Sequence, residues 1–348
     1  MQPVGAGLKQ RWKTLRRDLR YYCLVVPGIF LCSRLPWRLA APLGHLLGTI
    51  GWLVAAKARR IAVENLRPAF GETMTAAERR RVTRGVFRNT VTNILEVLAV
   101  RRWPPERIRE HFGFETDFRR IQTMFPEGVI GLTAHLGNWE LLGILFGAYL
   151  PGRAAPVARR IYFEKFQRLV EKLRGGAGIE TIYTDESPRK FLQAIRDGKI
   201  LGILPDQNLH VVGGVFVDFF GRPAYTLTTP VNLALSSGAP VCCIYLVREG
   251  RRFRVIAEPI PIARTGRREE DLLENTRRWS AFLEAEIRKR PEQWVWFHKR
   301  WRTQPGAEPR ERKRWRRADG TRAPASVASD GSVASDGAES ASQDQDTE

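Results

Sequence analysis

The chain has 348 residues, enough for one large domain or two small ones, and 43% of them are hydrophobic, so a sizeable core is possible. Its formal net charge of +20 indicates a polyanionic partner: a nucleic acid, an anionic membrane surface, an acidic protein or a phosphorylated substrate. A codon bias toward arginine is a simpler explanation for part of this excess. The cysteines Cys23, Cys32, Cys242 and Cys243 include no CxxC pair and no zinc spacing, so we expect a reducing compartment, no metal and no cofactor.

The N-terminal part combines basic and apolar segments. Basic residues are frequent before residue 20, and two apolar stretches follow, Tyr21–Cys32 and Leu39–Ala56. The first is too short for a membrane span and the second is near the lower limit of about 18 residues. Basic flanks, together with Trp37 and Trp52, favour contact with a membrane interface. Three interpretations stay open: a single transmembrane helix, a re-entrant or interfacial hairpin, and buried core helices.

The middle of the chain changes from a helical pattern to alternating strands and helices. Thr75 and Glu78 form a capping-box pattern that predicts a helix running through Val100. Seven β-rich runs follow: Gly128–Thr133, Ala155–Ala158, Ile179–Tyr183, Ile200–Leu204, Val215–Phe219, Val241–Val247 and Phe253–Ala257. The helices predicted among them are Glu140–Leu150, Phe163–Arg174, Pro188–Arg196, Leu227–Ser236 and Glu269–Arg290. This alternation predicts an α/β fold with a mixed, largely parallel sheet flanked by helices.

The C-terminal part differs from the rest in composition. A basic run at Arg310–Arg317 precedes a tandem repeat of Ser-Val-Ala-Ser-Asp-Gly that begins at Ser326, and the end is polar and acidic. Such a segment cannot bury a core and is predicted to be disordered. We therefore expect three parts: a basic N-terminus and membrane anchor (1–60), a catalytic domain (61–302) and a disordered tail (303–348).

Residues able to do chemistry gather where the first predicted strand meets the next helix. His135 and Glu140 are five residues apart, which on one continuous helix would place them on different faces. We therefore expect His135 in the strand end or turn, Asn138 as the helix N-cap and Glu140 in the first helical turn. Glu140 can then accept a hydrogen bond from one imidazole nitrogen while the other acts as a general base. The same spacing is also typical of a helix cap beside an ordinary surface histidine.

The stretch from His135 to Glu140 resembles the HxxxxD/E motif of the glycerolipid acyltransferase superfamily, in the form found in the lipid A biosynthesis (lauroyl/myristoyl) acyltransferases. Further blocks resemble that family in the same order over residues 20–302: Val157–Arg159 with Lys165–Arg174, Leu204–Asn208, Gly214–Ala224, Ser237–Val241 and Arg290–Trp301. The second block departs from the family pattern, because Arg160 and Phe163-Glu164 replace its usual Arg-Pro and Asn-Pro steps. Asp218 also stands where the family usually has proline.

The resemblance implies an enzyme that moves a fatty acyl chain from a thioester, usually on acyl carrier protein, to a hydroxyl of a lipid A precursor. His135 would take the hydroxyl proton, and Glu140 would orient His135 and stabilise its charge. Arg159 and Arg174 would bind phosphate or phosphopantetheine, and backbone N–H groups near Gly137–Trp139 are expected oxyanion donors. The enzyme would sit at the inner (cytoplasmic) membrane with its catalytic domain facing the cytoplasm. No GxSxG nucleophile elbow is present, so direct transfer is expected.

Two other features have open interpretations. Asp206 follows a buried strand, where a lone charge is costly, so it is expected to orient Arg159, Arg174 or His135, or to cap a turn. The cluster of Trp294, Trp296 and Trp301 with nearby basic residues is predicted to form an amphipathic element near lipid headgroups.

Other functions are compatible with parts of the sequence. The acceptor could instead be a phosphatidylinositol mannoside or an ornithine lipid, and the donor could be a coenzyme A thioester. A nucleic-acid-binding protein would also be basic, but no recognisable binding module is present, so no nucleic-acid partner is expected.

Overall fold

The computed structural model of the protein describes residues 18, 21–161, 163–175, 178–209 and 213–306. The predictions for residues 1–17, for the basic run at 310–317, for the tandem repeat and for most of the disordered tail lie outside the described residues.

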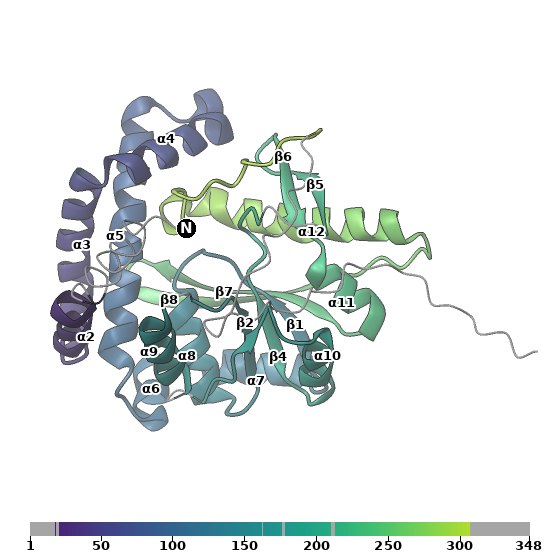
Figure 1. Ribbon diagram of the computed structural model, residues 1–348, viewed down its shortest axis with the longest axis horizontal. Coiled ribbons are helices and arrows are strands. Elements are labelled where there is room, and N and C mark those ends of the chain that lie inside the picture. The colour runs from purple at the N-terminus through teal and green to yellow at the C-terminus, as the bar shows by residue number, and fades with distance from the viewer. Residues whose placement is uncertain (1–17, 19–20, 162, 176–177, 210–212, 307–348) are drawn as a thin grey trace, which may run out of the picture. The chain divides into compact units, whose positions relative to one another are not determined.

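A six-stranded sheet lies at the centre of the fold, with the strand order β3-β2-β4-β1-β7-β8 (Figure 1). Neighbouring strands from β3 to β7 run parallel, and β8 runs antiparallel to β7. The strands are β1 (Val129–Leu132), β2 (Ala154–Ala158), β3 (Ile182–Tyr183), β4 (Ile200–Ile203), β7 (Val241–Glu249) and β8 (Arg252–Ile260). The predicted α/β fold with a mixed, largely parallel sheet is confirmed.

A separate antiparallel pair consists of β5 (Gly214–Asp218) and β6 (Pro223–Leu227), and β5 packs against α12 (Arg268–Lys289). The sequence predicts β5 but not β6, and it begins the next helix at Leu227, which is the last residue of β6. The strand signal of β6 is weak because the strand begins with Pro223, and proline is tolerated in a sheet mainly at a strand start or an edge.

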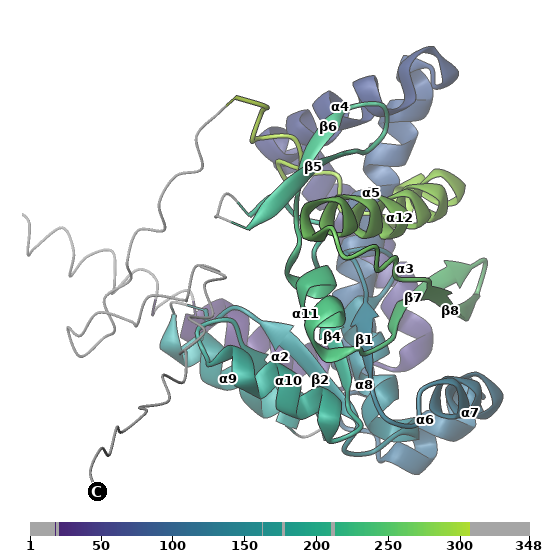
Figure 2. The same ribbon diagram turned by 90° about the vertical axis from the view of Figure 1, so that its right-hand side faces the viewer.

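Helices cover both faces of the sheet (Figure 1, Figure 2). One face and its core cluster are covered by α6 (Pro105–Phe112), α7 (Glu115–Met124) and α8 (Trp139–Tyr149). The other face is covered by α10 (Pro188–Arg196), α11 (Thr229–Ser237) and α12. The helices α6 and α7 lie in a stretch for which the sequence yields no prediction.

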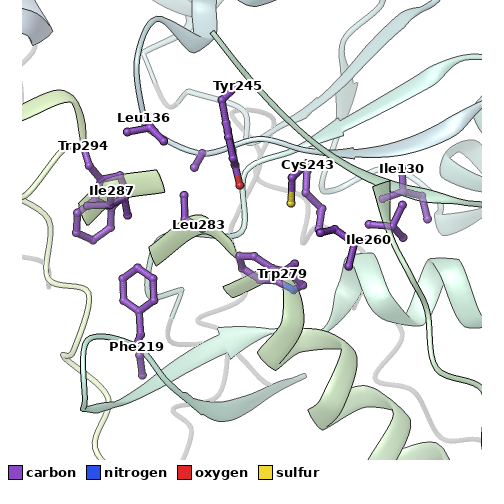
Figure 3. Packing of buried hydrophobic residues seen from close by; sticks show 14 of the residues in the cluster. Ile130, Leu136, Phe219, Cys243, Tyr245, Ile260, Trp279, Leu283, Ile287 and Trp294 are labelled. Atoms are coloured by element: carbon purple, nitrogen blue, oxygen red, sulfur yellow. The ribbon is translucent and has the colours of Figure 1, made fainter. Parts of the chain in front are cut away.

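The strand β7 is buried on both faces, which explains its continuous apolar sequence. Successive side chains alternate between the two core clusters, so Cys242 lies with α8 while Cys243 and Tyr245 lie with α12. Figure 3 shows Cys243 and Tyr245 pointing toward Trp279 and Leu283. Both adjacent cysteines are buried and free.

The long helix α5 (Ala76–Val100) connects the N-terminal helices to the sheet (Figure 1). It begins with the predicted capping box, in which Thr75 Oγ1 accepts from the Glu78 N–H and the Glu78 carboxylate accepts from the Thr75 N–H. The helices before it are η1 (Tyr21–Val25), α2 (Val26–Cys32), α3 (Trp37–Val54), α4 (Ala56–Phe70) and η2 (Gly71–Thr73). The domain boundary expected at residue 60 therefore falls within α4.

The helix α3 packs against α5 with its small residues inward and its large apolar residues outward. Ala40, Gly44 and Gly48 are buried, and a Cβ on Gly44 would lie 2.3 Å from Thr92 Oγ1. The outward face carries Leu46 and Leu53, which are 58% and 59% exposed, and continues over Leu39, Leu47, Ile50 and Val54. Within the described residues no single helix is long and apolar enough to cross a membrane; α3 and the helix after it meet that condition jointly but are bent by 91°.

Candidate active site

The expected site residues gather at one edge of the parallel strands. Arg159 directly follows β2, Asp206 follows β4 by three residues, and His135 follows β1 by three residues. These strands are neighbours in the order β2-β4-β1 and all point the same way. Their carboxyl ends therefore meet in one place, which is the usual position of a ligand site in an open α/β sheet.

A histidine–aspartate pair forms the centre of this edge. His135 Nδ1 lies 2.8 Å from Asp206 Oδ1, and the His135 backbone N–H donates to Asp206 Oδ2 at 2.9 Å. The Trp294 indole N–H also donates to Oδ2, at 3.0 Å. Asp206 is fully buried, and these donors satisfy its carboxylate. An ionised Asp206 requires the proton of a neutral His135 to be on Nδ1, so its Nε2 carries the lone pair.

The environment shifts the pKa values of both partners. Burial alone would lower the pKa of the His135 imidazole, but the charge and hydrogen bond of Asp206, with a smaller effect of Glu140, raise it above its ordinary value. Burial would raise the pKa of the Asp206 carboxyl, but its interactions with His135 and other neighbours hold that pKa well below the usual range. Asp206 is therefore ionised at neutral pH and fixes the tautomer of His135.

The sequence predicts Glu140 as the direct partner of His135, but in the structure the partner is Asp206. Glu140 Oε1 forms an ion pair with Arg174 Nη2 at 2.8 Å, while Asp206 holds the imidazole. The physical reason is the position of Glu140 in the first turn of α8, where its side chain is half exposed and faces α9 (Glu164–Gly175). Of the roles considered for Asp206, orientation of His135 is the one that the contacts support.

Asn138 is the N-cap of α8, as predicted. Its Oδ1 accepts from the Leu141 N–H at 3.1 Å. The preceding Gly137 has a φ of 63°, and a Cβ there would lie 2.0 Å from the Leu246 carbonyl oxygen. Only glycine fits this turn, because both the backbone conformation and the contact exclude a side chain.

The expected oxyanion donors need a partial correction. The Gly137 N–H already donates to the Gln293 carbonyl at 3.0 Å, and the Asn138 N–H donates to the Leu246 carbonyl at 2.9 Å. In the described part of the chain, the N–H groups of Trp139 and Glu140 have no acceptor. Because the first turn of a helix leaves such donors free, these two are the remaining candidates in this turn.

The two arginines expected to bind phosphate occupy different settings. Arg174 is partly buried in its ion pair with Glu140, whereas Arg159 is exposed at the end of β2. Arg159 forms no ion pair within the described residues. Arg159 follows the carboxyl end of β2, and Arg174 reaches the first turn of α8 through Glu140. Their binding role stays a prediction, as does the expected absence of a metal or cofactor.

The tryptophan-rich segment near the C-terminus is core, and the prediction that it lies near lipid headgroups is wrong. Trp294 and Trp296 are fully buried, and Trp301 is 6% exposed. Arg300 is also buried and donates to the Tyr225 carbonyl at 2.7 Å and to Thr226 Oγ1 at 2.6 Å. Burial lowers the pKa of the Arg300 guanidinium to about 10, so it stays charged at neutral pH.

The same segment completes the site, a role that sequence reasoning missed for Trp294. Leu136 and Trp294 form an antiparallel bridge, and the Val295 N–H donates to the His135 carbonyl at 3.1 Å. The backbone after η3 (Pro291–Gln293) thus runs beside His135 while the Trp294 side chain holds Asp206. The alternation Trp294-Val295-Trp296 is a signal for an extended, buried segment that could have indicated this.

A histidine held by a buried carboxylate, at the carboxyl edge of an α/β sheet, is an arrangement suited to activating a hydroxyl or water. Residues 9–303 match the model of one family, described as bacterial lipid A biosynthesis acyltransferase. The match covers most of the chain, so the chain belongs to this family and is an acyltransferase, as the sequence motifs predict.

Three curated relatives agree with the family assignment. The lipid A biosynthesis palmitoleoyltransferase of Escherichia coli (strain K12) is 25% identical over 285 residues, 80% of this chain and 90% of the relative. The lipid A biosynthesis lauroyltransferase of the same strain is 25% identical over 293 residues, 81% of this chain and 91% of the relative. The lipid A biosynthesis acyltransferase 1 of Shigella flexneri is 26% identical over 288 residues, covering 79% and 83%.

Proposed function

We propose that this acyltransferase moves a fatty acyl chain from an acyl carrier protein thioester to a hydroxyl of a lipid A precursor, with His135 as the general base. The observation that carries the proposal is the His135–Asp206 pair at the carboxyl edge of the sheet, in a chain that matches the lipid A family over residues 9–303. The lipid A acceptor is supported by the names of the curated relatives.

The proposed transfer needs only His135, the acceptor hydroxyl and the thioester to account for every bond and proton. His135 Nε2 takes the proton of the acceptor hydroxyl as its oxygen attacks the thioester carbonyl carbon. Asp206 stabilises the imidazolium that forms. The tetrahedral intermediate then expels the thiolate, which receives the same proton from Nε2. Gln207 Nε2, now 3.2 Å from His135 Nε2, occupies the position that the hydroxyl would take.

We propose that the first turn of α8 and the two arginines stabilise negative charge on the intermediate and on the bound phosphate groups. The unpaired N–H groups of Trp139 and Glu140 would donate to the oxyanion of the intermediate. Arg159 and Arg174 would bind phosphate groups of the acceptor or of the carrier's phosphopantetheine. Glu140 would hold Arg174 in place and add its charge to the field that raises the pKa of His135.

The cationic chain and α3 support an acidic carrier protein and a membrane as partners. An acidic carrier and the anionic cytoplasmic leaflet would both be attracted by a net charge of +20. Large apolar side chains on the outward face of α3, with small residues packed inward, are the arrangement expected for a helix in contact with hydrocarbon. We therefore propose the inner membrane as the site of action, with the catalytic residues on its cytoplasmic side.

The test is an assay with purified enzyme, a tetra-acylated lipid A precursor, and acyl carrier protein or coenzyme A thioesters of several chain lengths. We expect acylation from the carrier thioester. His135→Ala should lower kcat by about 10³-fold, because a general base contributes on this order. The exposed His111 is a matched control, and His111→Gln should keep the wild-type rate. An active His135→Ala enzyme would rule out the mechanism, and acylation from coenzyme A alone would rule out the carrier.

A second variant tests the carboxylate. Asp206→Asn removes the charge that raises the pKa of His135, so kcat should fall by about 10²- to 10⁴-fold. The base must be neutral to act, so wild-type activity falls as the pH drops through the raised pKa of His135. In Asp206→Asn this acid limb of kcat/KM should move to lower pH. An unchanged acid limb would show that Asp206 does not interact with the base.

A further inference from the structure

A buried carboxylate that the proposed reaction does not use lies beside the turn from His135 to Glu140. Glu96, on α5, is 2% exposed. Both of its oxygens lie 2.6 Å from Arg248 Nη2, and Oε2 also accepts from Asn138 Nδ2 at 3.0 Å. Burial raises the pKa of the Glu96 carboxyl, and Arg248 and Asn138 act against this rise. The close arginine favours the ionised form.

The charge of Glu96 contributes to the direction in which the Asn138 amide faces. A carboxylate can only accept hydrogen bonds, so the Asn138 NH₂ must point toward Glu96. The amide oxygen is then left facing the Leu141 N–H, where it caps α8. A flipped amide would place its oxygen against the Glu96 carboxylate and its NH₂ against the Leu141 N–H. Both contacts are repulsive, and the Asn93 carbonyl, which accepts from Asn138 Nδ2 at 3.4 Å, favours the same orientation as the ionised Glu96.

The rest of the turn is held by the same neighbours. Asn93, one helical turn before Glu96, donates from Nδ2 to the Gly137 carbonyl at 2.6 Å. Gln293 accepts from the Arg248 N–H and donates to the Arg248 carbonyl, and its own carbonyl accepts from the Gly137 N–H. The turn is thus fixed by α5, by β7 and by η3. Glu96 is the charged group that joins the first two of these elements.

We propose that Glu96 is a positioning residue for acyl transfer, which orients the Asn138 amide and thereby fixes the start of α8 relative to His135. This inference rests on the proposed role of His135 as the base. The N–H groups of Trp139 and Glu140 follow the cap directly, so their direction depends on it. A small displacement of such groups weakens catalysis much more than substrate binding.

The decisive experiment exchanges donor and acceptor between positions 96 and 138. Glu96→Gln removes the charged acceptor of the Asn138 amide and should lower kcat about tenfold, with KM changed less than twofold. Asn138→Asp places two carboxylates together in a buried site and should lower kcat further. In the Glu96→Gln/Asn138→Asp protein, the side-chain amide at position 96 can donate a hydrogen bond to the carboxylate at position 138. That carboxylate can still cap α8. One negative charge remains near Arg248. The double variant should regain at least tenfold in kcat over Asn138→Asp.

The matched control is Glu286→Gln. Glu286 is 4% exposed on α12 and pairs with Arg290 at 2.6 Å, so its loss also breaks a buried ion pair, but away from Asn138. It should lower stability and leave kcat per folded enzyme unchanged. A double variant no more active than Asn138→Asp, or an equal loss of kcat in Glu286→Gln, would overturn the proposal.

Amide hydrogen exchange supplies a readout that needs no substrate. Exchange at the Leu141 and Leu142 N–H groups, which donate to the Asn138 side chain and carbonyl, should become at least tenfold faster in Glu96→Gln, return toward wild type in the double variant and stay unchanged in Glu286→Gln. Unchanged exchange in Glu96→Gln would refute the positioning role even if the enzyme is active as proposed. Altered exchange in Glu96→Gln, together with a wild-type protein that acylates no lipid A precursor, would instead refute the proposed function alone.

Discussion

The helix α3 and the segment from Trp294 to Trp301 are alike in composition and opposite in burial. Both combine large apolar residues with basic neighbours, and both are predicted from sequence to meet a membrane. In α3 the large side chains point outward and the buried face consists of small residues and Trp52. In the tryptophan segment the large side chains are the core, and even Arg300 is buried. Composition thus does not separate a helix with an exposed apolar face from a core segment, whereas the placement of small residues does.

The largest expected effect comes from replacing a core tryptophan. Trp294→Ala should cost about 3–5 kcal/mol of unfolding free energy, the usual range for deleting a buried aromatic side chain. It also removes a hydrogen bond to Asp206, so activity should be lost. Leu46→Ala, on the outward face of α3, should stay within about 0.5 kcal/mol of wild type. Urea denaturation in detergent measures both, and equal losses would contradict the contrast between the two regions.

A second comparison tests the inward face of α3. In Gly44→Ala the new Cβ would meet the Thr92 side chain and backbone, so we expect a loss of about 1–3 kcal/mol. Gly51→Ala is the matched control on the same helix, because its Cβ would lie 3.7 Å from Phe87 Cδ1, an ordinary contact. There the better helix propensity of alanine should stabilise the protein by up to about 1 kcal/mol. Thermal unfolding should shift in opposite directions, and shifts of the same sign would argue against close α3–α5 packing.

A substitution on the outward face of α3 should have the smallest effect on the free energy of unfolding and the largest effect on membrane binding. Leu46→Gln should leave unfolding unchanged but weaken binding to anionic vesicles by about 1.5–3 kcal/mol, the contribution of one fully buried leucine. Leu273, 45% exposed on α12, provides the control, and Leu273→Gln should bind vesicles as wild type does. Vesicle cosedimentation compares them, and equal binding by both variants would exclude α3 as the contact.

Sequence patterns predict the features that are local along the chain. The capping box at Thr75, the N-cap at Asn138 and most strands of the sheet follow from neighbouring residues, and the structure has them. Most predicted ends are off by one or more residues; α5, with its cap at Thr75, and α10, where Pro188 defines the start, have the predicted ends. The strand β6 is missed because its signal begins with a proline.

The site is less predictable because its partners are distant in the chain. His135 meets Asp206 across 71 residues, and Trp294 meets Asp206 across 88. Local spacing favoured Glu140, which is nearer in sequence but faces Arg174. The strand order brings β4 beside β1, and this order is a property of the sheet that no local pattern of the chain contains.

The bridge between Leu136 and Trp294 has a consequence for how the enzyme is made. Because a ribosome delivers the chain from its N-terminus, α3 leaves the ribosome long before Trp294 is synthesised. The outward face of α3 is therefore exposed at a stage when Asp206, which holds His135, still lacks the hydrogen bond from the Trp294 indole. The ribosome must synthesise the chain as far as Trp294 before all contacts that position His135 can form. A nascent or truncated chain that ends before Trp294 would therefore expose the apolar face of α3 but lack the indole donor to Asp206.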